Sequence, residues 1–147
     1  MSLYTLSWFI AAAVNIGLGL FVFVRNPRSE VNRTFMLAVL CIALWAVDLF
    51  GLAVAADAET ARRWSLVFIN GIVFVSSCGF HFLCAYSGSI TPRIRRLIGA
   101  SYIISTGFAL ANVLGFFPRD YVRVCLLYTS DAADDLLCVD LGGRRII

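Results

Sequence analysis

The residues that could do chemistry in this chain are polar side chains set inside long apolar runs: Asp48 and His81, together with Asn15, Asn70 and Asn112. A polar group inside a lipid-crossing helix is costly, so it either joins helices together or forms a site. At a rise of about 1.5 Å per residue, Asp48, Asn70 and Asn112 come to roughly 7–10 Å from one membrane face. These three side chains can therefore share one polar layer.

Two interpretations of this layer remain open. Amides can hold helices together in lipid, each contributing about 0.6–2 kcal/mol, and this packing role is the commoner one. The alternative is a sensory ligand or proton site around Asp48, whose carboxyl group would have to be protonated, hydrogen-bonded or paired at that depth. His81 lies near the opposite membrane face, too far from Asp48 for direct pairing, and we expect an interhelical hydrogen bond there.

The residues that could serve an enzyme or hold a metal do not form a recognisable set. Cys41, Cys78 and Cys84 lie in apolar runs, and with His81 they lack the spacing of a metal site, so we expect small buried apolar residues. Residues 1–124 contain no nucleophile–base pair and no glycine-rich phosphate loop. The chain has no lysine for a retinal Schiff base. We therefore predict no catalytic, metal-binding or cofactor-binding residue, and no cofactor.

The elements that position these residues follow from composition. The chain is 61% apolar and 14% charged, with a mean hydropathy of +0.87, whereas soluble domains carry about 25% charged residues. Apolar runs cover residues 4–24, 34–55, 64–86 and 97–117, each close to the roughly 20 residues that a membrane-crossing helix needs. The predicted fold is all-α: a polytopic membrane protein with four transmembrane helices.

Arginines between the runs predict the orientation. The connections at 25–33 and 87–96 carry three arginines each, and residues 1–24 carry none. By the positive-inside rule these two connections are cytoplasmic and the N-terminus is outside, in a multi-pass protein of the inner (plasma) membrane. The net charge of +3 is spread over such clusters, so the lipid bilayer is a predicted partner and nucleic acid is not.

The closing segment, residues 125–147, differs from the apolar runs that precede it. Cys125 to Asp134 back-translates to TGTCTCTTATACACATCTGACGCTGCCGAC, and Val139 to Ile147 to GTAGATCTCGGTGGTCGCCGTATCATT. These resemble the two adapter sequences of a common short-read sequencing library, with room between them for an index of about eight bases. We therefore expect residues 125–147 to be a non-native tail that contains no domain. The native sequence would then end near residue 124, and the part of the gene that follows would be missing.

The remaining sequence resembles a known family, and the connection "RNPRSEVNRTF" carries most of the likeness. Its matching residues are Asn26, Pro27, Arg28, Ser29, Asn32, Arg33 and Phe35; Asn15, Trp45, Trp64 and the pair His81–Phe82 add support. Residues from about 7 to the end of the fourth run resemble the N-terminal seven-helix region of bacterial sensor histidine kinases. The likeness covers four of the seven helices.

This resemblance implies a truncated seven-helix bundle that acts as the membrane-embedded sensory input module of a signal-transduction protein. The intact chain would feed a cytoplasmic output domain, either a histidine kinase or a diguanylate cyclase, and would work as a homodimer. The fragment itself would have no catalytic domain. Two other classes stay open: a transporter or permease fragment, with helices broken at mid-membrane and internal repeats, and a small membrane protein complete as it stands.

The matching connection also has a physical interpretation of its own. Pro27 interrupts a helix, Ser29 can cap a turn, and Asn32 can cap the second helix. Arg28 and Arg33 would lie at anionic headgroups. A structural turn is the simplest role, and a contact surface for a cytoplasmic effector is the alternative.

Overall fold

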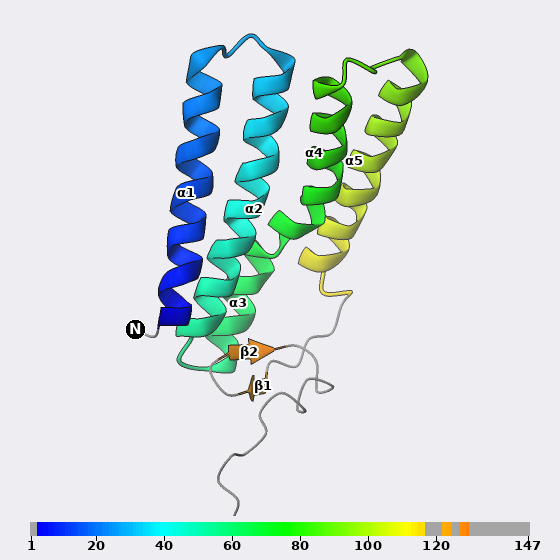
Figure 1. Ribbon diagram of the computed structural model, residues 1–147. Helices are drawn as coiled ribbons and strands as arrows, with labels where there is room; N and C mark the ends of the chain where they lie inside the picture. Colours follow the sequence, from blue (N-terminus) through cyan, green and yellow to red (C-terminus); the bar gives the residue numbers. More distant parts are fainter. Residues whose placement is uncertain (1–2, 117–121, 125–126, 130–147) are drawn as a thin grey trace, which may run out of the picture.

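A computed structural model describes residues 3–116, 122–124 and 127–129. The described elements, in chain order, are α1 (Leu3–Arg25), α2 (Glu30–Val54), α3 (Ala58–Phe68), α4 (Asn70–Tyr86), α5 (Pro92–Val113), β1 (Val122–Val124) and β2 (Leu127–Thr129). In Figure 1, α2 lies between α1 and α4, and α5 lies beside α4. The all-α prediction is confirmed, since the two strands form only a three-residue antiparallel pair, Val122 opposite Thr129.

Three segments of the described chain are long and apolar enough to cross a membrane: Thr5–Arg25, Glu30–Val54 and Ala58–Tyr86. The chain is therefore a multi-pass membrane protein. The fourth expected run corresponds to α5, which starts at Pro92 and contains three arginines near its beginning. α5 is not among the three segments above. The last residue expected in that run, 117, lies outside the described residues.

Helix α2 begins four residues before the expected run because Ser29 caps it. The Ser29 hydroxyl accepts a hydrogen bond from the Asn32 backbone N–H at 3.4 Å. Asn32 therefore lies inside the first turn and is not the cap that its residue type suggested. Its side-chain amide instead donates to the carbonyl of Val22 near the end of α1, at 2.9 Å. This bond ties the first turn of α2 to the last turns of α1.

The expected run 64–86 is two helices, α3 and α4, which meet at Ile69. The side-chain amide of Asn70 donates back to the carbonyls of Leu66 (2.9 Å) and Val67 (3.1 Å) at this junction. Gly71 then brings α4 against α2, because a Cβ at this position would lie 2.6 Å from the carbonyl oxygen of Cys41. The polar back-bonding and the close approach together account for the interruption.

Helix α3 starts earlier than expected because Asp57 caps it, accepting the Thr60 backbone N–H at 2.8 Å. That hydrogen bond lowers the pKa of the exposed Asp57 carboxyl group below its ordinary value. Two residues further, in the first turn, Glu59 pairs with Arg62 (2.9 Å) and Arg63 (2.7 Å) on the same helix surface. The polar start of α3 thus lies at the same end of the bundle as the N-terminus (Figure 1).

Small residues on α2 form much of the buried interior. Ala38, Ala43 and Ala46 are buried between the neighbouring helices, and small side chains let helices approach closely in lipid. On α3, the Trp64 ring lies over Gly51 of α2, and its indole N–H donates to the Val47 carbonyl at 2.9 Å. α2 is therefore the central helix, with α1 on one side and α3 and α4 on the other.

The two connections predicted to be cytoplasmic, 25–33 and 87–96, correspond in the structure to the turns at residues 26–29 and 87–91. Figure 1 shows both at one end of the bundle, opposite the N-terminus and the short α2–α3 connection. Gly88 leaves α4 at φ +64°, a conformation that glycine adopts readily. Thr91 then caps α5 by accepting the Ile94 N–H at 3.3 Å, and Pro92 occupies its first turn.

Candidate functional site

The contact between α4 and α5 is lined by polar pairs at three depths. The Asn112 amide donates to the Asn70 side-chain oxygen at 3.3 Å. The Ser77 and Ser105 hydroxyls lie 2.8 Å apart. The His81 ring nitrogen Nδ1 lies 3.4 Å from the Tyr102 hydroxyl. We call this set the polar seam; its residues are Asn70, Ser77, His81, Tyr102, Ser105 and Asn112.

The spacing of these residues explains why they meet. On α4 the seam residues are seven and four positions apart, and on α5 three and seven, so each set lies on one helix face. The two helices run antiparallel, as Figure 1 shows, so the first seam residue of α4 meets the last of α5. The seam is thus a consequence of helical periodicity on two neighbouring chain segments.

Burial makes these hydrogen bonds significant. Ser77, Ser105 and Asn112 are only 2%, 6% and 4% exposed. Each has a second protein partner or a short bond: Ser105 also donates to the Val73 carbonyl at 3.0 Å, and Asn112 to the Leu66 carbonyl at 3.4 Å. Buried polar groups without partners are strongly unfavourable, so this satisfied pattern fixes how α4 and α5 sit against each other.

At one end the polar seam reaches α2. The His81 Nε2 atom lies 3.6 Å from a carboxylate oxygen of Glu30, the first residue of α2. A pocket of about 290 Å³ opens beside this pair and is also lined by Arg33, Thr34 and Leu37. The ring of Phe35 packs on Phe82 with centroids 5.3 Å apart. Residues of the matching connection and the His81–Phe82 pair are therefore in direct contact.

Two thiols lie next to the seam. The sulfur atoms of Cys41 on α2 and Cys78 on α4 are 3.7 Å apart. The Tyr102 hydroxyl donates to the Cys78 sulfur at 3.6 Å. Tyr102 thus touches both His81 and Cys78 and connects the seam to the α2–α4 contact.

Of the predicted polar layer, the structure joins Asn70 to Asn112. Asp48 lies on α2 and is 1% exposed, in the part of α2 that packs on α3 near Gly51 and Trp64. Ser65 on α3 is equally buried. Whether the three residues act as one sensory layer stays a prediction. Of the loop residues, Asn26, Pro27, Arg28 and Arg33 are exposed, whereas Ser29 and Asn32 make the capping and helix-joining bonds.

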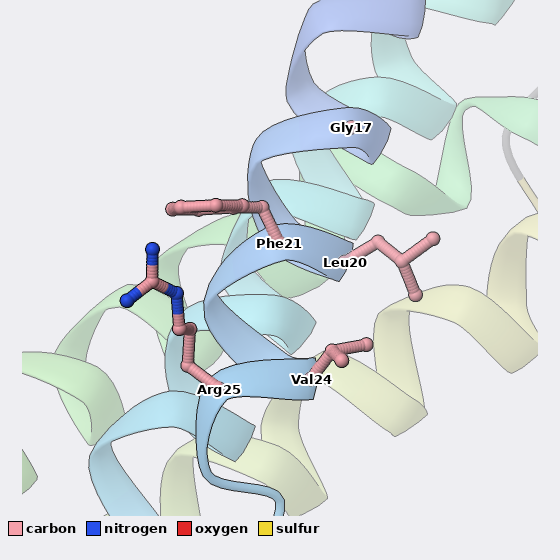
Figure 2. Close-up of a pocket in the computed structure, with 5 residues that line it drawn as sticks. All are labelled: Gly17, Leu20, Phe21, Val24 and Arg25. Carbon is pink, nitrogen blue, oxygen red and sulfur yellow. The ribbon is translucent and has the colours of Figure 1, made fainter.

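A second cavity, of about 480 Å³, runs along the outer face of α1. Figure 2 shows Phe21 and Arg25 on one side of the helix and Leu20 and Val24 on the other, below Gly17. The Arg25 guanidinium lies 4.8 Å from the centre of the Phe21 ring. These apolar side chains are more than half exposed, as expected for a helix face that meets lipid.

Four residues of this site were not recognised from the sequence: Glu30, Ser77, Tyr102 and Ser105. Serine and tyrosine are common in apolar runs and carry no charge, so neither attracts notice alone. The available signal was their spacing, because Ser77 follows Asn70 by seven positions and Ser105 precedes Asn112 by seven. Glu30 was assigned to a connection, since the early start of α2 depends on the Ser29 cap.

Comparison with known proteins agrees with this architecture. Residues 7–134 match the family described as the N-terminal 7TM region of histidine kinase. The match includes ten residues, 125–134, of the segment whose codon pattern predicts an adapter origin. No curated protein and no solved structure shows significant similarity to the chain. Because the family match covers most of the sequence, the chain belongs to the family of N-terminal 7TM regions of histidine kinases.

Proposed function

We propose that this chain reads a signal inside the bacterial plasma membrane and passes it to a cytoplasmic kinase domain of the intact protein. The N-terminus lies outside, and the connections at 26–29 and 87–91 lie in the cytoplasm. The family match carries the proposal. The short connection between α2 and α3, residues 55–57, leaves no room for an external sensory domain there, so a signal read by this segment is read within the helices, at the membrane surface or through a partner.

Buried polar groups are where such a signal would act. Asp48 is nearly inaccessible, and the polar seam fixes α4 against α5. A ligand or a proton that changed either arrangement would change how the helices sit together. In the intact protein, which we propose to be a homodimer, that change would reach the output domain.

Asp48→Asn in the intact kinase tests this function. The substitution keeps the shape of the side chain and removes its ionisable group, so we expect autophosphorylation in native membrane vesicles to change by severalfold. Asp57→Asn is the matched control, because Asp57 is exposed and asparagine is an equally good helix cap. Unchanged signalling in Asp48→Asn, at normal membrane levels, would leave Asp48 with a packing role alone.

The interruption at Ile69 favours one alternative, a transporter fragment, because broken helices at membrane depth often form substrate sites. The genomic reading frame beyond codon 124, obtained without library adapters, distinguishes the classes. Further helices followed by a kinase domain would support the proposed sensory input region of a kinase. Further helices followed by a diguanylate cyclase domain would keep the sensory role and change only the output domain. A second, inverted bundle would indicate a transporter, and an immediate stop codon a small membrane protein.

The same genomic sequence tests the proposed origin of residues 125–147. We expect native codons after residue 124 to encode a different continuation. Recovery of the sequence CLLYTSDAADD from the genome would contradict the adapter interpretation and make the tail part of the protein.

A further inference from the structure

We propose that Cys41 and Cys78 form a redox-active dithiol that a lipid-soluble quinone oxidises to a disulfide between α2 and α4. The sulfur atoms are already in contact at 3.7 Å. A disulfide bond is about 2.05 Å long, so closure requires the two atoms to approach by less than 2 Å. Side-chain rotation with a small helix adjustment supplies such a movement.

The backbone supports this closure. Gly71 lets α4 approach α2 so closely that a Cβ there would meet the Cys41 carbonyl oxygen and the Trp45 backbone nitrogen. The two helices are therefore in backbone contact next to Cys41. Because the two sulfur atoms already touch, a small adjustment of these packed helices would bring the cysteines to the Cα separation that a disulfide needs, about 4.4–6.8 Å.

The depth of the two thiols in the membrane determines which class of oxidant can reach them. Cys41 is eleven residues into α2, and Cys78 is eight residues before the end of α4. At about 1.5 Å per residue, they lie roughly 16 and 12 Å from the cytoplasmic ends of their helices, near the middle of a hydrocarbon core about 30 Å thick. Charged oxidants are excluded from this depth. Cys41 is partly exposed at the bundle surface, where a quinone dissolved in lipid can reach it.

The step is balanced with a benzoquinone as the oxidant. Two S–H bonds break, one S–S bond forms, and the two electrons and two protons pass to the quinone, which leaves as the hydroquinone. Tyr102 is the positioning residue, since its hydroxyl donates to the Cys78 sulfur at 3.6 Å and orients that sulfur toward Cys41. His81, bonded to Tyr102 and close to Glu30, holds that hydroxyl in place.

The experiment uses the full chain reduced and reconstituted in liposomes, then exposed to a short-chain benzoquinone or to its hydroquinone. Peptide mapping by mass spectrometry follows the cross-link between the peptides containing residues 41 and 78. We expect this cross-link with the quinone and not with the hydroquinone. Free thiols at both positions after quinone treatment, or linkage of other cysteine pairs in its place, would overturn the proposal.

Variants make the assignment specific. Cys41→Ala and Cys78→Ala keep a small apolar side chain and should abolish the cross-link, whereas Cys84→Ala, on the same helix as Cys78, should retain it. Tyr102→Phe should slow cross-linking roughly 2- to 10-fold, as expected for loss of one hydrogen bond to the reacting sulfur, while the final yield stays the same. An unchanged rate would remove Tyr102 from the proposal. The readout is chemical, so it is independent of kinase activity.

Discussion

Residues of one type have different roles in this bundle. Asn15 donates to the Ala11 carbonyl of its own helix at 2.8 Å. Asn32 joins two helices at a turn, and Asn112 joins α5 to α4 deep in the bundle. Sequence identified Asn15, Asn70 and Asn112 as polar groups at membrane depth, because their surroundings are apolar. It could not assign partners, since a partner depends on how each helix is rotated about its axis.

The pair Asn70–Asn112 provides a prediction at this scale. Asn112→Leu removes a donor to the Asn70 oxygen and the Leu66 carbonyl, and we expect a loss of about 0.6–2 kcal/mol in stability. Unfolding of the chain in mixed micelles, followed by circular dichroism, measures this loss. Asn15→Leu is the control, because its amide bonds only within α1 among the contacts described. Equal effects from the two substitutions would contradict a specific role for the α4–α5 contact.

At the scale of elements, helix ends and interruptions depend on local hydrogen bonds that apolar runs do not reveal. The four runs located the helices, but α2 and α3 start earlier because Ser29 and Asp57 cap them. No proline in α3 or α4 indicates the interruption at Ile69. It depends on Asn70 bonding backward and on Gly71 meeting α2, and the second of these is a contact distant in sequence.

Gly71 therefore provides a prediction at the element scale. Gly71→Ala places a Cβ against the backbone of α2, and we expect a destabilisation of about 1–3 kcal/mol from overpacking. Gly79→Ala, on the same helix, meets no atom within 4 Å, so it should be neutral or stabilising by up to about 1 kcal/mol. Unfolding in micelles compares the two variants. Equal stability of both would show that α2 and α4 are not in backbone contact.

At the scale of the whole molecule, the alternating direction of the helices follows from hydrophobic length and arginine placement. Both signals are spread over many residues, so single exceptions do not alter them. The bundle shows the expected arrangement, with residues 26–29 and 87–91 at one end (Figure 1). Which face of the membrane that end occupies, and whether α5 crosses completely, remain predictions.

Cysteine accessibility tests this orientation in the intact cell. In a cysteine-free background, we expect Ser29→Cys and Ser87→Cys to resist a membrane-impermeant maleimide added outside, whereas Ala56→Cys should react, because the α2–α3 connection lies at the opposite end. Permeabilised cells should label all three positions. Labelling of Ser29→Cys and Ser87→Cys from opposite sides would contradict the four-helix topology.

The bond from Asn32 to the Val22 carbonyl has a consequence for biogenesis. It joins residues only ten positions apart, and it completes a helical hairpin from the first 54 residues of the chain. Contacts so local can form as soon as both segments have left the ribosome, before α4 exists. The hairpin of α1 and α2 can therefore enter the bilayer as one unit and present its alanine-rich face as a template on which the later segments assemble.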